Sequence, residues 1–289
     1  MIRYLSAIGM SRCITVKAAS RLVQHFLQHP QNEPALVRDP SSGDHLVELV
    51  WSMDHFGLVL RGRISAPGQV EVHELMPAIL DFAEGQRLED WEVVSTDRRT
   101  PVLFAVDPTY DSTIDLIIQR LQRLPSAMPR PESIVVGSAA LSVSGKILLA
   151  VTHTAEDEAA WKEEDALRRS LARRLRRGDR SAERELREEE DALQEDVLDR
   201  LDQEDVYTIL EGLMDPIDEA TPAYYHVLGT IRRIRKILNP FSEEWVYQLS
   251  LDVMGSPCIV YINPKDLAGE PAVGRRFLGP CLMVGDILS

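Results

Sequence analysis

Residues 156–205 interrupt the pattern of a globular protein more sharply than any other part of this 289-residue chain. Acidic and basic side chains crowd together there, and aromatic residues stop after Trp161. A segment this polar cannot bury enough apolar surface to fold alone. We therefore expect an N-terminal domain over 1–155, a charged helical connector over 156–203 and a C-terminal domain over 204–289.

The composition predicts a soluble, folded protein in a reducing compartment. Hydrophobic residues make up 44% of the chain, which is long enough for two ordinary domains. No run approaches the ~20 apolar residues that cross a bilayer, and no charged leader precedes an apolar run. We expect a cytoplasmic protein with no membrane partner. The three cysteines lie far apart in apolar surroundings, which predicts buried thiols and no disulfide framework.

Two helices are expected in the N-terminal domain. Apolar residues recur at steps of three and four from Ala18 to Leu27, which predicts a helix that ends before Pro30. Asp111 is expected to cap a second helix, which carries apolar residues as far as Leu124. Together with the strands described next, these helices predict an α+β domain.

An alternation with a period of two predicts the antiparallel sheet of this domain. The expected strands cover residues 46–51, 57–64, 70–75, 91–94 and 102–106. Residues 134–136 and 147–151 are expected to pair as a closing hairpin. The N-terminal domain is thus predicted to carry one meandering sheet.

The C-terminal domain is predicted to be a small β-barrel of the OB or SH3-like kind. The expected strands cover residues 206–213, 224–238, 245–253, 258–262 and 277–288. Five short strands within roughly eighty residues are typical of small closed barrels.

Six short segments carry a family resemblance over almost the whole chain. They are residues 4–9, 141–149, 177–179, 225–231, 263–271 and 273–279. Together they resemble an uncharacterised bacterial family that is catalogued only as a domain of unknown function. The resemblance implies a cytoplasmic bacterial protein and supplies no activity, cofactor or catalytic residue.

Basic residues of the C-terminal domain are the candidates for nucleic-acid binding. They are Arg232, Arg233, Arg235, Lys236, Arg275 and Arg276. Strand alternation places those of the first long strand on both faces, which does not define one binding surface. The formal net charge of −14 also repels polyphosphate at long range. Nucleic-acid binding by an OB-like barrel is therefore an alternative hypothesis.

No recognisable motif predicts a catalytic, cofactor or metal site. His25 and His29 have the i, i+4 spacing of metal ligands but lack a third ligand in the sequence, so we interpret them as structural or exposed. An enzyme with a site in the N-terminal domain is the second alternative, because folding can bring distant residues together. Its candidate residues are His45, Asp54, His55 and His73.

We therefore predict a non-enzymatic interaction or scaffold protein with no cofactor. Its expected partner is another protein or a second copy of itself. Docking would use the barrel or the connector, and the charged segment would steer the partner electrostatically.

Overall fold

The structure is a computed structural model that describes residues 1–66, 69–82, 84–96, 100–110, 112–125, 131–150, 210, 212–218 and 221–288, together with Ser170, Leu171, Arg174 and Ser181. The chain forms two compact units. One unit contains Met1–Leu148 and Gly212–Ser289, and the other is Leu149–Glu211. The predicted connector lies outside the described residues except for the four named above, whose backbone is helical. Within the described part, no helix has the length and apolar character to span a membrane.

Helix α1, Val16–Gln28, forms as predicted. Thr15 caps its start by accepting a hydrogen bond from the backbone N–H of Ala18. Its buried residues, Ala19, Leu22 and Phe26, lie at helical steps on one face. The helix ends two residues before Pro30, because proline lacks the N–H that a helix interior needs.

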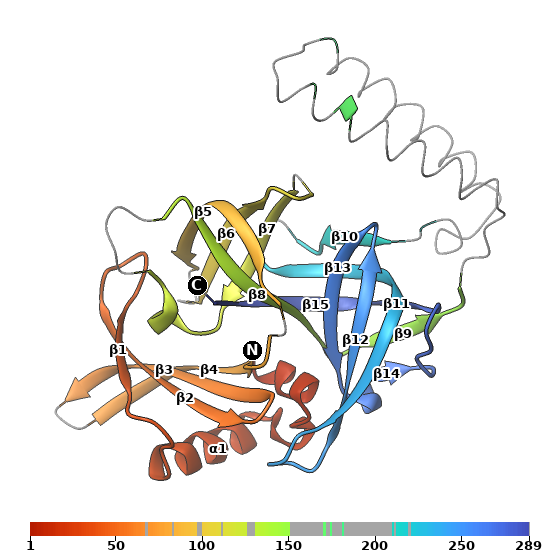
Figure 1. The fold of residues 1–289 in the computed structure, drawn as a ribbon. Coiled ribbons are helices and arrows are strands. Elements are labelled where there is room, and N and C mark those ends of the chain that lie inside the picture. The colour runs from red at the N-terminus through yellow and green to blue at the C-terminus, as the bar shows by residue number, and fades with distance from the viewer. Residues whose placement is uncertain are drawn as a thin grey trace. The chain divides into compact units, whose positions relative to one another are not determined.

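The first sheet is antiparallel and has the order β1-β2-β3-β4 (Figure 1). Its strands are β1 Ala35–Arg38, β2 His45–Met53, β3 Phe56–Ala66 and β4 Gln69–Ile79. Consecutive pairing confirms the predicted meander from β2 to β4.

The second sheet is mixed and contains eleven strands among the described residues. Its order is β10-β11-β12-β13-β8-β5-β6-β7-β15-β9-β14. The strands are β5 Gln86–Ser95, β6 Pro101–Asp107, β7 Ser112–Ile118, β8 Ser133–Ser142, β9 Gly145–Leu148, β10 Leu213–Pro216, β11 Tyr224–Leu238, β12 Trp245–Val253, β13 Ser256–Ile262, β14 Leu267–Ala268 and β15 Arg276–Ile287. The described structure is therefore mainly β with few helices.

Part of this sheet closes into a ring of strands. Strand β15 pairs antiparallel with both β11 and β8, while β13 pairs parallel with β8. The ring thus contains β11, β12, β13, β8 and β15. Because β8 comes from the N-terminal half, residues 204–289 alone do not supply every strand of the ring. Buried residues from both halves also belong to one hydrophobic cluster.

The predicted helix after Asp111 is wrong, since Ser112–Ile118 is strand β7. This stretch is rich in β-branched residues, among them Thr113, Ile114 and Ile117, which favour strands. Pairing with β6 then fixes the extended conformation. Helical spacing of its apolar residues was the weaker signal.

The predicted closing hairpin is also wrong. Strand β9 pairs with β15 and β14, whereas β8 pairs with β5, β13 and β15. Strands β5 and β6 likewise belong to the second sheet and do not extend the first. Each of these pairings joins segments that are far apart in sequence, so local patterns could not predict them.

The N-terminal turns, η1 Ile2–Ile8 and η2 Ser11–Cys13, are held against the ring by hydrogen bonds. The Asn239 side chain donates to the carbonyl of Ile8 at 2.6 Å. Ser6 donates to Asp266 at 2.5 Å; Asp266 lies in the turn η4, Pro264–Asp266. Two of the segments that carry the family resemblance, residues 4–9 and 263–271, therefore meet in space.

A buried ion-pair network ties the first sheet to the end of β7 and the turn η3, Leu121–Arg123. Arg61 is 3% exposed, and its guanidinium lies 2.9 Å from Glu48 and 2.7 Å from Glu74. It also donates to the carbonyls of Ile118 and Gln119. Four acceptors thereby satisfy one planar cation that would otherwise be costly to bury.

Candidate functional site

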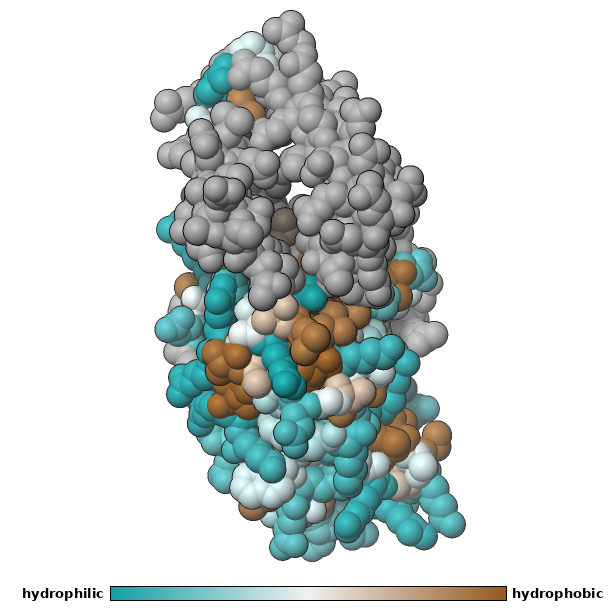
Figure 2. All heavy atoms as spheres, turned by 90° about the vertical axis from the view of Figure 1, so that its right-hand side faces the viewer, coloured by the Kyte–Doolittle hydropathy of each residue, from teal (hydrophilic) through white to brown (hydrophobic). Residues whose placement is uncertain are grey.

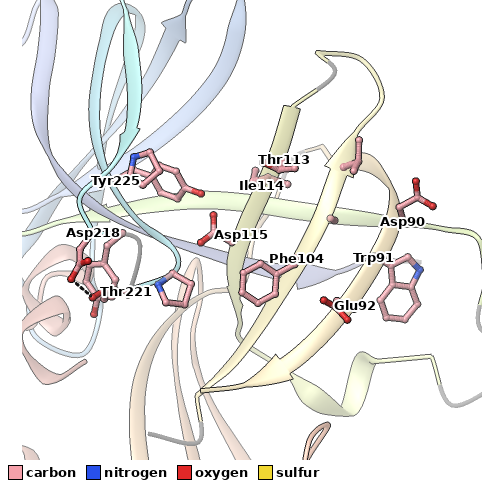
Figure 3. Close-up of a pocket in the computed structure, with 15 residues that line it drawn as sticks. Asp90, Trp91, Glu92, Phe104, Thr113, Ile114, Asp115, Asp218, Thr221 and Tyr225 are labelled. Carbon is pink, nitrogen blue, oxygen red and sulfur yellow. Dashed lines mark hydrogen bonds between the residues drawn. The ribbon is translucent and has the colours of Figure 1, made fainter. Parts of the chain in front are cut away.

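An open pocket of about 910 Å³ gathers both aromatic and ionisable side chains (Figure 3). Strands β5, β6 and β7 form one wall, and β10 with the start of β11 and the turn between them forms the other. Its lining residues are Asp90, Trp91, Glu92, Phe104, Ala105, Val106, Thr113, Ile114, Asp115, Pro216, Asp218, Thr221, Pro222, Tyr224 and Tyr225. All of them belong to the unit that contains both sheets.

Asp115 is the central ionisable group of this pocket. In Figure 3 its carboxylate points into the space between Tyr225 and Phe104. It accepts a hydrogen bond from the backbone N–H of Ala223, which has a left-handed backbone with φ of 64°. Burial raises the pKa of the Asp115 carboxyl above its ordinary value, and the hydrogen bond from Ala223 opposes this effect.

The aromatic walls are anchored by contacts outside the pocket. The indole nitrogen of Trp91 donates to the carbonyl of Pro131 at 2.9 Å. The ring of Tyr224 packs against that of Tyr4, with 6.0 Å between the ring centroids. These contacts orient two of the lining side chains before any ligand arrives.

A bulge in β5 shapes the rim of the pocket. The pairing of β5 with β6 shifts between Glu89 and Glu92, and Asp90 has a left-handed backbone with φ of 46°. An extra residue in one strand turns side chains away from their regular alternation. As a result, three consecutive residues, Asp90, Trp91 and Glu92, all contribute to the lining.

The lining is acidic. Asp90, Glu92, Asp115 and Asp218 contribute four carboxyl groups, and the lining residues in the described structure include no lysine, arginine or histidine. Carboxylates that share one hollow attract cations and repel anions. The arrangement therefore favours a positively charged ligand over a phosphate.

The predicted nucleic-acid residues lie elsewhere and differ in accessibility. Arg232, Arg233 and Arg235 are exposed on β11, whereas Arg276 is 4% exposed on β15. Arg275 is exposed and donates to the carbonyl of Glu270 at 3.1 Å. The six basic residues thus do not form one accessible surface.

Two of these cations already have partners. Arg232 is the extra residue of a bulge in β11, and its guanidinium lies 2.7 Å from Asp252. The ammonium of Lys236 lies 5.3 Å from the ring centroid of Trp245 and 5.8 Å from that of Tyr247. Figure 2 shows that apolar residues on the side of the ring strands form separate patches among hydrophilic side chains.

The candidate residues of the enzyme hypothesis do not converge. His45 is the first residue of β2, whereas His55 lies two residues past its other end at Met53, and the strand between them is about 26 Å long. His55 pairs with Asp81 at 2.7 Å, and His73 is exposed on β4. His45 lines a hollow of about 320 Å³ beside the paired Asp44 and Arg63.

The helical histidines also form no metal cluster. The rings of His25 and His29 lie 4.8 Å apart, and a ring nitrogen of His29 lies 3.1 Å from the carbonyl of His25. Among the residues that the structure describes, no group of three or more potential ligands could hold a metal ion.

Fold and pocket define the class: a mainly β protein with a strand ring and an open pocket that is both aromatic and acidic. Residues 5–285 match the family described as "Domain of unknown function, E. rectale Gene description (DUF3881)", and the chain belongs to this family. The resemblance inferred from the sequence is confirmed. No curated protein and no solved structure matches this chain.

The pocket residues were not predicted from the sequence. Asp115 fell within the predicted helix after Asp111, and Trp91 fell within the predicted strand 91–94. The one local signal was the acidic pair that flanks Trp91, Asp90 and Glu92, which interrupts a strand pattern. The opposite wall is contributed by residues more than a hundred positions later, and no local pattern connects the two.

Proposed function

We propose that this protein is a non-enzymatic interaction protein, and that it docks a partner protein in the aromatic and acidic pocket. The pocket itself is the observation that carries the proposal. It combines apolar area from Trp91 and Phe104 with the charge of Asp115, which is the composition of many recognition sites. Its anchored side chains reduce the entropy that a partner would lose on binding.

The test uses the full chain in three forms. We immobilise three forms as baits: the wild type, Thr113→Arg and Thr109→Arg. The proteins that each bait captures from the same cell extract are then compared. Thr113 is an exposed lining residue, so arginine there occupies part of the pocket and offsets one of its negative charges. Thr109 is exposed and lies outside the lining, which makes it a matched control.

We expect a partner that the wild type and Thr109→Arg capture equally and that Thr113→Arg loses. Light scattering of the same three proteins shows whether that partner is a second copy of the chain. Capture that is identical for all three forms, or no capture by any, would contradict the proposed docking site.

A second candidate function is binding of single-stranded nucleic acid at the rim of the ring. Lys236 supports it, because its ammonium lies beside Trp245, which is 47% exposed, and Tyr247. An exposed aromatic ring with a neighbouring cation suits base stacking. The full chain must be used, because β8 completes the ring. The wild type should shift the gel mobility of a labelled single-stranded nucleic acid at low salt. Loss of this shift in Trp245→Ala would favour this candidate.

A further inference from the structure

We infer that the pocket recognises an arginine side chain of the partner protein. This inference rests on the proposed docking function and names the chemistry that the pocket selects. Its basis is the combination of carboxylates and aromatic faces in one hollow, with no basic side chain among the described lining residues.

The first step is the charge. Asp90, Glu92, Asp115 and Asp218 come from three different segments of the chain and all line the pocket, where Asp218 also accepts a hydrogen bond from Thr221. A cation that enters it meets negative charge from both walls, whereas an anion is repelled by both. Asp115 is half-buried, so its interaction with a ligand is screened less than that of a surface carboxylate.

The second step distinguishes arginine from other cations. The exposed Phe104 and the half-buried Trp91 add flat aromatic surface beside these carboxylates, and the mostly buried Tyr225 borders it. A guanidinium is planar, stacks on aromatic rings and offers two parallel donors to one carboxylate. An ammonium is a compact and strongly hydrated charge. It stacks on aromatic rings less well than a guanidinium and cannot form the same paired hydrogen bonds to one carboxylate.

The third step is size. About 910 Å³ exceeds the space that a single side chain needs, and the pocket is open to solvent. Sites of this volume hold drug-sized ligands, which leaves room for an arginine side chain and part of the backbone that carries it. The arginine would therefore enter as part of an exposed segment of a folded or extended partner.

The experiment observes the indole N–H signals of the full chain labelled with ¹⁵N-tryptophan. The chain has four tryptophans, and a Trp91→Phe variant assigns the signal of Trp91. The probe is N-acetyl-arginine methylamide, and its citrulline counterpart has nearly the same shape without the charge. A single residue should bind with a Kd on the order of 1 mM.

We expect the arginine probe to shift the Trp91 signal and the citrulline probe to leave it unchanged. Asp115→Asn should weaken binding of the arginine probe by about tenfold, since it removes one charge-assisted contact. Glu33→Gln, which changes an exposed carboxylate outside the lining, should have no effect.

A third probe, N-acetyl-lysine methylamide, carries the same charge without the planar group. Equal shifts from the arginine and citrulline probes, or from the arginine and lysine probes, would overturn the inference. So would the absence of any shift. If no probe binds while Thr113→Arg still loses the captured partner, the docking function stands and only the choice of arginine fails. If the capture experiment also fails, the proposed function fails with it.

Discussion

Ser11 donates two hydrogen bonds to Glu244 across 233 positions of the sequence. Its backbone N–H lies 3.1 Å from one carboxylate oxygen, and its hydroxyl lies 2.8 Å from the other. Asn263 and Lys265 donate to the same carboxylate. Glu244 is 8% exposed, so this one group joins the N-terminal turns to the ring with little access to water.

Glu244→Gln should lower the free energy of unfolding at pH 7 by about 1–3 kcal/mol, because the buried network loses its negative charge and one of its two acceptor oxygens. Hydrogen bonds from Ser11 help hold the pKa of Glu244 below its ordinary value despite burial. A lowered pKa contributes stability above the ordinary value of 4.5, and this stability is lost as pH falls through the folded-state pKa. Urea unfolding at pH 7 and pH 3 should therefore show that the free energies of unfolding of the wild type and Glu244→Gln differ less at pH 3. Glu33→Gln is the control, and a difference that persists undiminished at low pH would refute the assignment.

Arg61→Met should destabilise the protein by about 3–5 kcal/mol, because Glu48 and Glu74 would remain buried without their cation. Arg61→Lys should also destabilise it, since one ammonium cannot reproduce the fork that reaches two carboxylates and two carbonyls. Arg87→Lys alters an exposed pair with Glu89 and should cost less than about 1 kcal/mol. Chemical denaturation of the three variants checks the order, and equal costs for Arg61→Lys and Arg87→Lys would contradict it.

Asp115→Asn should raise the melting temperature at pH 7. Burial raises the pKa of Asp115, so the folded state disfavours its charged form. The cost to stability exists above the folded-state pKa and disappears as pH falls below the ordinary value of 3.8. Thermal unfolding measured from pH 7 to pH 3 should show the melting temperatures of the wild type and Asp115→Asn converging as the pH falls. Asp215→Asn, an exposed aspartate of β10 outside the lining, should follow the wild type throughout.

Alkylation by iodoacetamide at pH 8 should modify Cys13 before the other two cysteines. Burial raises the pKa of Cys258 to about 12 and raises that of Cys281 well above its ordinary value. Cys13 is only partly buried, and its pKa is raised by burial and by the neighbouring Glu244. Mass spectrometry of native protein should find Cys258 and Cys281 unmodified until denaturant is added. Rapid modification of either in the native state would show that the ring opens.

Local patterns predicted much of the secondary structure. The bounds of β11 and β12 agree with the predicted 224–238 and 245–253, because clear alternation and turn residues mark both strands. Strand β7 was predicted as a helix, since a short apolar run with residues at 114, 117, 121 and 124 also fits helical spacing. In that case pairing with a neighbouring strand decided the conformation.

The arrangement of the strands and the pocket could not be predicted in this way. The pairings of β8 with β13 and β15 join residues more than a hundred positions apart. Such contacts are specified by the fit of whole surfaces, which leaves no periodic signal in one segment. Asp115 and Tyr225 meet for the same reason, so the candidate site appears only once the sheet has formed.

Strand β15 contacts four partner strands, β7, β8, β9 and β11. During translation it leaves the ribosome after all of them. Until β15 is in place, the edges of β8 and β11 that it covers present unpaired backbone N–H and C=O groups, and such edges readily pair with other strands. A folding intermediate that lacks β15 would therefore be prone to associate with other copies through these two edges.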